Sequence, residues 1–214
     1  MLSWSGGKDS VLALQALVEV GAPPDGLLTT VVGPARDVTH HEVPLLLVER
    51  QAAAVGLPLH LVELPHDPPN DVYLDRLGAA LRRLGDVATV ASGDLHLADL
   101  RAWREQQLAE LGVAAEFPLW GRSSAEVART AATSLDATVC VVDTDQLDAR
   151  FVGRAYDLDL LAELPATVDP AGERGELHTF VTDAPSFARP VAVTVGAPTG
   201  ADGRFVRAEL VPAP

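Results

Sequence analysis

Residues 3–10 read Ser-Trp-Ser-Gly-Gly-Lys-Asp-Ser, and the expected fold follows from this stretch near the amino terminus. Its adjacent glycines, Gly6 and Gly7, allow a tight backbone turn that can approach another group closely. Apolar residues with helical spacing begin at Val11, directly after the turn. A glycine turn that opens a helix presents free N–H groups and the positive end of the helix dipole, so this stretch predicts a phosphate-binding site.

Polar side chains in the same stretch favour that interpretation. Lys8 supplies a full positive charge, and Ser5 and Ser10 supply hydroxyl donors. Lys8 is the only lysine in the chain, and a compact ammonium among phosphates is not interchangeable with a guanidinium. The spacing differs from the longer glycine loop of the P-loop enzymes. A plain strand-to-helix turn, capped by an aspartate or serine side chain, is the alternative.

The composition sets the class of protein. The chain has 214 residues, of which 48% are hydrophobic, enough for one large or two small domains with a buried core. No stretch of about 18 residues is free of charge and no secretory signal is apparent, so we expect no membrane span and no export. The single cysteine, Cys140, lies in an apolar run and is expected in the core of a cytoplasmic protein.

The formal net charge of −14 argues against one class of partner. A nucleic-acid backbone is bound by clustered lysine and arginine side chains, so we expect no nucleic-acid contact. An acidic surface does not attract nucleotides in general either. A nucleotide must therefore be bound locally, at residues 3–10.

Strands and helices alternate through the first half of the chain. The expected strands are residues 1–4, 27–32, 59–64 and 87–91, and the expected helices are residues 8–20, 40–55, 72–84 and 97–111. Residues 33–39 and 65–70 are expected loops. The alternation predicts an α/β fold in which a parallel doubly wound sheet has helices on both faces. The first expected strand is so short that a few residues before Met1 could be missing from the sequence.

The second half has a different pattern. The expected strands are residues 114–119, 138–142, 177–182, 190–195 and 204–211, and the expected helices are residues 124–134 and 151–164. A hairpin through residues 200–203 is expected to join the last two strands. We place a domain boundary near Gly112, which divides the chain into a nucleotide-binding domain, residues 1–112, and a smaller C-terminal α+β domain, residues 113–214.

Two further groups of polar residues are candidates for a site. Open α/β sheets bind ligands at the carboxyl ends of their strands, and Asp94 follows the strand expected at residues 87–91. Its carboxylate could hold Mg²⁺ beside phosphates, or it could cap the next helix. His40 and His41 stand beside Glu42, but neighbours in sequence do not share a helix face, so a satisfied or solvent-facing pair is favoured over a metal site.

Several short motifs follow one another in an order that resembles a known family. Residues 5–10, Ser-Gly-Gly-Lys-Asp-Ser, are similar to the pyrophosphate loop of the ATP pyrophosphatases. Gly-Asp-Leu-His at residues 93–96, Phe-Pro-Leu-Trp-Gly at residues 117–121 and Gly-Glu-Arg-Gly-Glu at residues 172–176 then occur in order. The ordered set resembles the diphthine–ammonia ligase family, and is closest to its short prokaryotic branch. The resemblance covers nearly the whole chain.

The resemblance implies an N-terminal domain of the adenine-nucleotide α-hydrolase type, and it implies roles for individual residues. The residues that would hold the ATP phosphates are Ser5, Gly6, Gly7, Lys8, Asp9 and Ser10. His41 matches a histidine that the family often has after the second strand, and Asp94 would face the nucleotide. Glu173 and Glu176 would face ATP across the cleft between the domains. Without the family, residues 172–176 could equally be a turn with two surface glutamates.

The resemblance also implies a reaction. A substrate carboxylate would attack the α-phosphate of ATP with Mg²⁺ assisting, pyrophosphate would leave, and ammonia would then displace AMP to form an amide. The catalytic set would be Lys8, Asp94, Glu173 and Glu176, with Asp94 as the metal ligand. The carboxylate in the family's named reaction is that of diphthine on elongation factor 2. The alanine-, arginine- and valine-rich composition hints at a bacterial source, in which another small or protein-borne carboxylate would take its place.

Two other functions stay open. The chain could be an ATP-binding or sensing protein without turnover, or a simple nucleotide hydrolase in which water takes the place of the amine. The sequence names neither the acyl substrate nor the nitrogen donor. It leaves the oligomeric state open as well, with a homodimer as one option.

Overall fold

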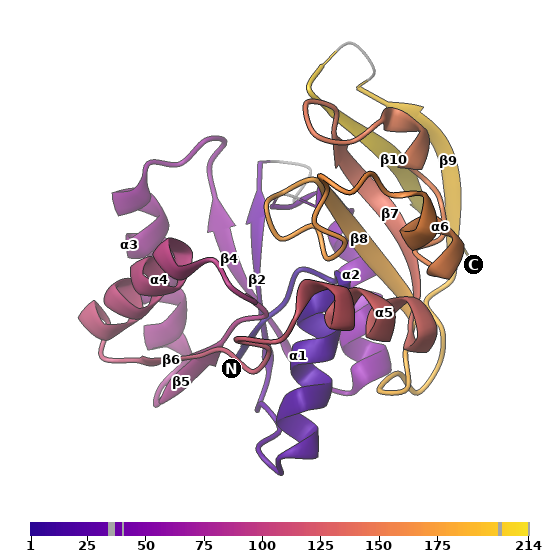
Figure 1. Ribbon diagram of the computed structural model, residues 1–214. Helices are drawn as coiled ribbons and strands as arrows, with labels where there is room; N and C mark the ends of the chain where they lie inside the picture. The colour runs from indigo at the N-terminus through magenta and orange to yellow at the C-terminus, as the bar shows by residue number, and fades with distance from the viewer. Residues whose placement is uncertain (34–36, 40, 201–202, 214) are drawn as a thin grey trace.

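The protein folds as two sheets with helices around them (Figure 1). The computed structural model describes residues 1–33, 37–39, 41–200 and 203–213. A six-stranded, mostly parallel sheet occupies the first half, and a four-stranded antiparallel sheet occupies the second half. This arrangement confirms the expected α/β class with a smaller C-terminal part.

The first sheet is doubly wound. Its strands are β1 (Leu2–Ser3), β2 (Leu27–Val32), β3 (Asp37–Val38), β4 (Leu59–Leu64), β5 (Thr89–Ala91) and β6 (Ala114–Glu116). The parallel strands lie in the order β4-β2-β1-β5-β6. The short β3 runs antiparallel to the far end of β2, where Val38 faces Val31. Because β6 pairs with β5, this sheet continues past the boundary expected near Gly112.

Helices cover both faces of this sheet, as expected. They are α1 (Lys8–Glu19), α2 (Leu45–Val55), α3 (Asn70–Leu84) and α4 (Ala98–Glu110). Leu77 and Leu81 of α3 and Leu108 of α4 pack with Val62 and Val90 of the sheet in one apolar cluster. Helices α1 and α2 contribute to a second, larger cluster that lies on the other face. Figure 1 shows α3 and α4 on the side of the sheet away from α1 and α2.

The second sheet has the strand order β8-β7-β10-β9. Its elements are α5 (Ser124–Ser134), β7 (Asp136–Asp143), a 3₁₀ turn (Ala149–Phe151), α6 (Leu158–Glu163), β8 (Leu177–Asp183), β9 (Val193–Thr199) and β10 (Phe205–Pro212). Strands β9 and β10 pair antiparallel, which confirms the predicted hairpin. The Gly203 amide donates to the Gly200 carbonyl at 3.0 Å, and residues 201–202 of this turn lie outside the described residues.

One apolar core joins the two sheets. The larger cluster runs from Leu47 of α2 through Val139 of β7 to Phe180 of β8, and all three side chains are completely buried. Burying apolar surface is the main favourable contribution to folding. Because both halves bury their apolar faces against one another, we expect each half to depend on the other for stability.

The helix predicted from residue 40 begins later than expected. Helix α2 starts at Leu45, after Pro44 at the N-cap position. Glu42 has a φ angle of 49°, so the backbone just before the helix is left-handed. His41 and Glu42 therefore belong to a turn, and His40 lies outside the described residues. The loop expected at residues 33–39 includes the short strand β3, and residues 34–36 lie outside the described residues.

The helix predicted for residues 151–164 was also wrong in extent. A 3₁₀ turn ends at Phe151, Gly153 adopts a φ angle of +78°, and helix α6 begins only at Leu158 with Asp157 as its N-cap. A left-handed glycine interrupts helical geometry, and an aspartate cap restarts it. Two strand predictions moved as well: β6 ends at Glu116, and β9 is Val193–Thr199.

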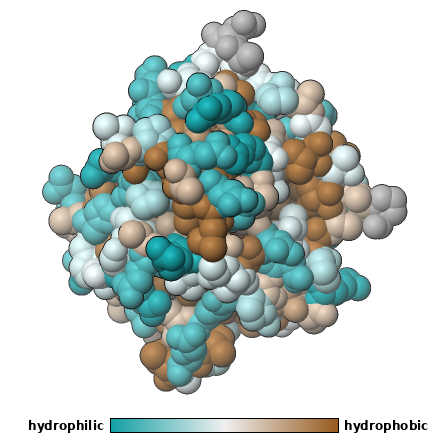
Figure 2. Space-filling model, turned by 45° about the vertical axis from the view of Figure 1, so that its right-hand side comes forward, coloured by the Kyte–Doolittle hydropathy of each residue, from teal (hydrophilic) through white to brown (hydrophobic). Residues whose placement is uncertain are grey.

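On the face of the molecule shown in Figure 2, hydrophobic residues (brown) and hydrophilic residues (teal) are interspersed. Large apolar side chains that are exposed on the second sheet are Val195, Phe205 and Val211. Within the described ranges, no helix is long and apolar enough to cross a bilayer.

A buried carboxylate at the end of β7 should contribute to stability. Asp143 is 1% exposed, and its Oδ2 lies 2.6 Å from an Arg204 guanidinium nitrogen. Hydrogen bonding to Arg204 lowers the Asp143 pKa far below its usual value. We expect Arg204→Gln to lower the melting temperature by about 2–4 °C near pH 7, because the buried Asp143 carboxylate loses its arginine partner.

The pH dependence provides the control for this prediction. A carboxyl whose pKa is lowered by folding stabilises the protein above its unfolded pKa and loses that effect as the pH falls. The difference between Arg204→Gln and the wild type should therefore shrink below about pH 4, as followed by calorimetry. Arg154→Ala, which breaks an exposed pair with Glu163, should barely change the melting temperature. Equal effects of the two variants would contradict the role of Asp143.

Candidate active site

The candidate site lies at the point where the strand order of the first sheet reverses. From β1 the chain moves outward to β2 and β4 on one side, then returns to β5 and β6 on the other. In open α/β sheets, ligands bind at the carboxyl ends of two neighbouring strands whose following loops leave in opposite directions. The loop after β1 holds residues 5–7, and the loop after β5 holds Gly93 and Asp94. The two predicted stretches therefore come together.

The phosphate loop, residues 5–10, has the expected glycine turn at the start of a helix. Gly6 has a φ angle of +79°, and Gly7 is the N-cap of α1 without any side-chain capping bond. The Ser10 hydroxyl instead donates to the Gly7 carbonyl at 2.8 Å, and Ser5 Oγ accepts from the Gly7 amide at 3.3 Å. The alternative of a turn capped by an aspartate or serine is therefore not what the structure shows.

The side chain of Gln51, in α2, fixes the phosphate loop through hydrogen bonds. Its Nε2 donates to the Gly6 carbonyl at 3.0 Å and to the Val181 carbonyl at 2.6 Å, and its Oε1 accepts from the Trp4 indole at 3.0 Å. Gln51 is completely buried. The Val181 amide of β8 also donates to the Gly6 carbonyl at 3.0 Å. The loop is thus fixed to the second sheet as well as to the first.

Lys8 is buried and paired. Its side chain is 2% exposed, and Nζ lies 3.0 and 2.8 Å from the two Asp9 carboxylate oxygens. Nζ also donates to the Ala171 carbonyl. The ammonium lies 5.7 Å from the centre of the Tyr156 ring. The backbone amide of Lys8 donates to Thr179 Oγ1 at 3.1 Å.

Asp94 faces Arg104 of α4. Its Oδ2 lies 2.9 Å from Arg104 Nε. Burial raises the Asp94 pKa, Arg104 opposes that rise, and the charge of Asp9 adds to it. The N-cap of α4 is Leu97, so Asp94 does not cap that helix. The metal-binding role of Asp94 stays a prediction.

Gly93 explains how Asp9 and Asp94 come close. A Cβ atom at Gly93 would lie 2.8 Å from the Asp9 carbonyl oxygen and 2.9 Å from its carbonyl carbon. Only a glycine permits this approach of the two backbones. The loops after β1 and β5 are therefore packed against each other at the switch point.

The two glutamates of residues 172–176 have different environments. Glu173 Oε1 accepts from the amides of Leu95 and His96 at 2.8 and 3.2 Å, so it reaches the loop after β5. Burial raises the Glu173 pKa, the two amides oppose the rise, and Asp9 and Asp94 add to it.

Glu176, in contrast, is 2% exposed and lies inside its own loop. Its two oxygens accept from the amides of Asp169 and Arg174 at 2.9 and 3.0 Å. The structure therefore brings Glu173 to the loop after β5. It places Glu176 as a support of the loop backbone.

His41 lies on the other side of the phosphate loop. Its Nδ1 is 3.0 Å from the Thr179 carbonyl, and its ring centre is 4.7 Å from that of His178. A Cβ atom at Gly7 would lie 2.5 Å from His41 Cε1, so the imidazole packs directly on the glycine backbone. Neighbouring Glu42 forms an ion pair with Arg207.

A preformed metal centre is not part of this arrangement. Among the described residues, no group of three histidine, cysteine, aspartate or glutamate side chains could hold a metal ion. The charge of Asp9 nevertheless contributes to the raised pKa of Asp94, and the charges of Asp9 and Asp94 contribute to the raised pKa of Glu173, in both cases after burial. The donors suit a hard cation such as Mg²⁺.

Several contacts at the site carry no signal in the sequence. Thr179, Asp169 and Ser124 each touch the site from the second half of the chain, through Lys8 or His96. Only Gln51 could have been noticed, because it is a polar residue on the otherwise apolar buried side of α2. A polar residue in such a position must find buried partners.

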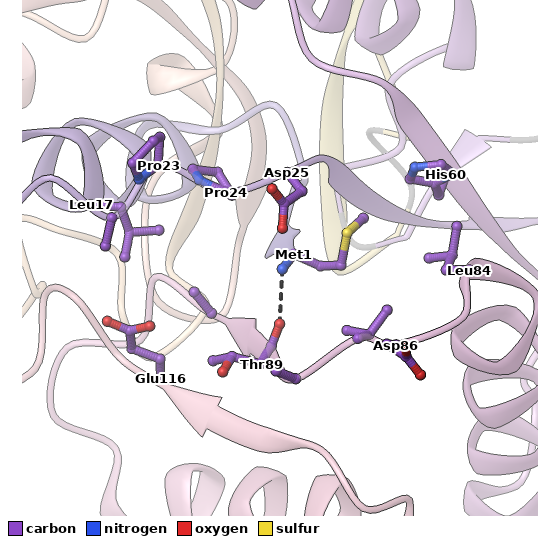
Figure 3. Close-up of a pocket in the computed structure, with 14 residues that line it drawn as sticks. Met1, Leu17, Pro23, Pro24, Asp25, His60, Leu84, Asp86, Thr89 and Glu116 are labelled. Carbon is purple, nitrogen blue, oxygen red and sulfur yellow. Dashed lines mark hydrogen bonds between the residues drawn. The ribbon is translucent and has the colours of Figure 1, made fainter.

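A pocket of the described residues lies away from the candidate site. It measures about 420 Å³ and is lined near the amino ends of β2, β4 and β5 by residues such as Asp25, His60 and Thr89. Figure 3 shows Met1 in its centre, with the terminal ammonium donating to the Thr89 carbonyl at 2.8 Å. None of the predicted site residues lines this pocket.

The fold defines an α/β protein with a glycine turn at the switch point of a doubly wound sheet. Residues 1–115 match the model of the diphthamide synthase N-terminal domain, and residues 123–199 match that of the diphthamide synthase C-terminal domain. The first match alone covers more than half of the 214 residues, and the chain belongs to the diphthamide synthase family. This confirms the resemblance of the motifs and indicates an enzyme of the ATP pyrophosphatase type.

Other comparisons add less. No curated protein matches the chain. A solved structure, the predicted subunit of tRNA methyltransferase from Methanocaldococcus jannaschii, is 18% identical, with a TM-score of 0.47 over 86% of this chain and 95% of that chain.

The Gln51 contacts give a prediction about stability. Replacing Gln51 with leucine keeps the approximate volume but leaves the Trp4 indole N–H and the Val181 carbonyl without this partner. We expect Gln51→Leu to lower the free energy of unfolding by about 3 kcal/mol in urea titrations. Gln106→Leu, on the exposed side of α4, serves as the matched control and should change it by less than about 0.5 kcal/mol. A similar small change in both variants would show that Gln51 does not support the loop.

Proposed function

We propose that the protein is an ATP pyrophosphatase that adenylates a carboxylate and joins it to ammonia, releasing AMP and pyrophosphate. The observation that carries this proposal is the glycine turn at the switch point, with Gly7 as the helix N-cap and the chain's only lysine directly after it. Membership of the diphthamide synthase family supports the same assignment. The reaction would take place in the cytoplasm on a small or protein-borne carboxylate.

Each part of the site has a role in this reaction. The positive end of the α1 helix dipole attracts phosphate oxygens, and the Lys8 ammonium stabilises the charge that develops on the leaving pyrophosphate. Ser5 and Ser10 stand beside the turn and keep its shape through hydrogen bonds to the Gly7 backbone. His41 packs on Gly7 and limits how far the loop can move.

The carboxylates have a second role. Asp94 is the residue we propose as the Mg²⁺ ligand, with Asp9 and Glu173 close by. When bound with ATP, Mg²⁺ would neutralise the phosphate charge that these carboxylates would otherwise repel. Glu173 joins the two sides of the site, and Glu176 acts as a positioning residue because it holds the loop that carries Glu173.

An ATP-binding protein without turnover is the second candidate. The feature that favours it is the pairing of Lys8 with Asp9 and Ala171, which keeps the ammonium away from solvent. Such a protein forms no product, and loss of Lys8 would change only its affinity for ATP.

Product analysis tests the ligase proposal. We would incubate the protein with ATP, Mg²⁺, ammonium and a panel of small carboxylates, and expect AMP and pyrophosphate to form only with a suitable carboxylate. Lys8→Ala should lower the rate at least about 100-fold, because it removes a charge that acts on the transition state. Arg154→Ala breaks an exposed ion pair with Glu163, outside the candidate site. It is the matched control and should keep full activity. Formation of ADP and phosphate would contradict cleavage between the α- and β-phosphates.

Gly93 gives a test by affinity alone. A methyl group at this position would meet the Asp9 backbone at 2.8 Å and push the phosphate loop away from the loop after β5. We expect Gly93→Ala to weaken ATP binding about tenfold in calorimetry. The control is Gly203→Ala, since the nearest atom to a Cβ there is 3.6 Å away. Unchanged affinity in Gly93→Ala would place the nucleotide elsewhere.

A further inference from the structure

The loop between α6 and β8, residues 165–176, lies over the phosphate loop and is called here the covering loop. Its Ala171 carbonyl accepts a hydrogen bond from Lys8 Nζ. Nearby, the Tyr156 hydroxyl donates to the Pro170 carbonyl, and the Tyr156 ring faces the Lys8 ammonium. The covering loop therefore meets the phosphate loop through the lysine.

The Lys8 ammonium has no hydrogen left for a phosphate in this conformation. An ammonium carries three N–H donors. Its acceptors are Asp9 Oδ1, Asp9 Oδ2 and the Ala171 carbonyl oxygen. The side chain is also only 2% exposed. A phosphate oxygen can reach Lys8 only if one of these acceptors leaves.

The covering loop has a fixed shape of its own. Glu176 accepts from the amides of Asp169 and Arg174, and Asp169 Oδ1 accepts from the amide of Ala171 at 2.9 Å. Gly172 donates to the Asp169 carbonyl, and Gly175 donates to the Gly172 carbonyl. These bonds hold the shape of the loop from within.

Besides Ala171, the covering loop meets the site through the bonds of Glu173 to the amides of Leu95 and His96, and through a 3.0 Å bond from Ser124 Oγ to Asp169. It is anchored elsewhere by the bond from Tyr156 to Pro170, by a 3.1 Å bond from the Asp143 amide to the Glu176 carbonyl, and by the burial of Val168 and Ala171 in the larger apolar cluster. In this position burial raises the pKa of Glu173, and the like charges of Asp9 and Asp94 add to the rise. Repulsion between like charges destabilises the conformation that brings them together.

We propose that the covering loop is an autoinhibitory latch, in which the Ala171 carbonyl occupies the position on Lys8 that a phosphate oxygen takes when nucleotide binds. Phosphate and the Ala171 carbonyl compete for the same N–H group, so an anion that binds Lys8 favours the open loop. A ligand shifts such an equilibrium by its difference in affinity for the two states. The inference rests on the proposed function, because it assumes that the phosphate loop binds ATP.

Hydrogen exchange followed by mass spectrometry tests the latch in the free protein first. Lys8→Met keeps the length of the side chain and removes every donor. Peptides from residues 165–176 should exchange about tenfold faster in Lys8→Met than in the wild type, while peptides from β7 stay unchanged. Arg154→Ala is the control, because it breaks an ion pair at the end of α6 without touching Lys8. If β7 also loses protection, Lys8→Gln replaces Lys8→Met.

The wild type is then measured with Mg·ATP and with inorganic pyrophosphate, and calorimetry records binding of each. Faster exchange of residues 165–176 on binding, with no further increase in Lys8→Met, is the expected result. Unchanged protection in free Lys8→Met would overturn the latch. Binding of ATP with unchanged or slower exchange would also overturn the latch and leave the proposed function standing. Failure of both ligands to bind would overturn the proposed function, and with it the ligand control of the loop.

Discussion

The rest of the site depends on the hydrogen bonds that the Gly6 carbonyl accepts from the Gln51 side chain and from the Val181 amide. Gly6 turns with a positive φ angle, and its carbonyl must find buried partners because water does not reach it. One partner comes from α2 and the other from β8. The phosphate loop therefore keeps its shape only when both sheets are in place.

Charge at the site is unevenly distributed. One lysine, itself covered by acceptors, stands among Asp9, Asp94 and Glu173, and Arg104 is engaged by Asp94. Such a site repels a bare nucleotide. We therefore expect ATP to arrive with its metal ion, which converts the same carboxylates from repelling groups into ligands.

The sequence located what depends on local pattern. Strands β2 and β4 match their predicted limits, because apolar residues there lie between glycine and proline signals. The helix starts near residues 40 and 151 were wrong, since Pro44 and Gly153 override an apolar pattern.

The same limit applies to the site. The glycine turn and Lys8 are local, and the motifs pointed to them. The contact of Gly6 with Val181 crosses most of the chain, and the difference between Glu173 and Glu176 arises only from how one loop folds. Contacts of this kind leave no periodicity in a single sequence. Only correlated substitutions at contacting positions, seen across many related sequences, would reveal them.

The common apolar core also bears on how such a protein can change over evolution. Leu47, Val139 and Phe180 come from distant parts of the chain and meet in one interior. A half that needs its neighbour to bury its apolar face cannot be exchanged for an unrelated module. New specificities would arise by substitution around the switch point, and the two halves would be inherited as one unit.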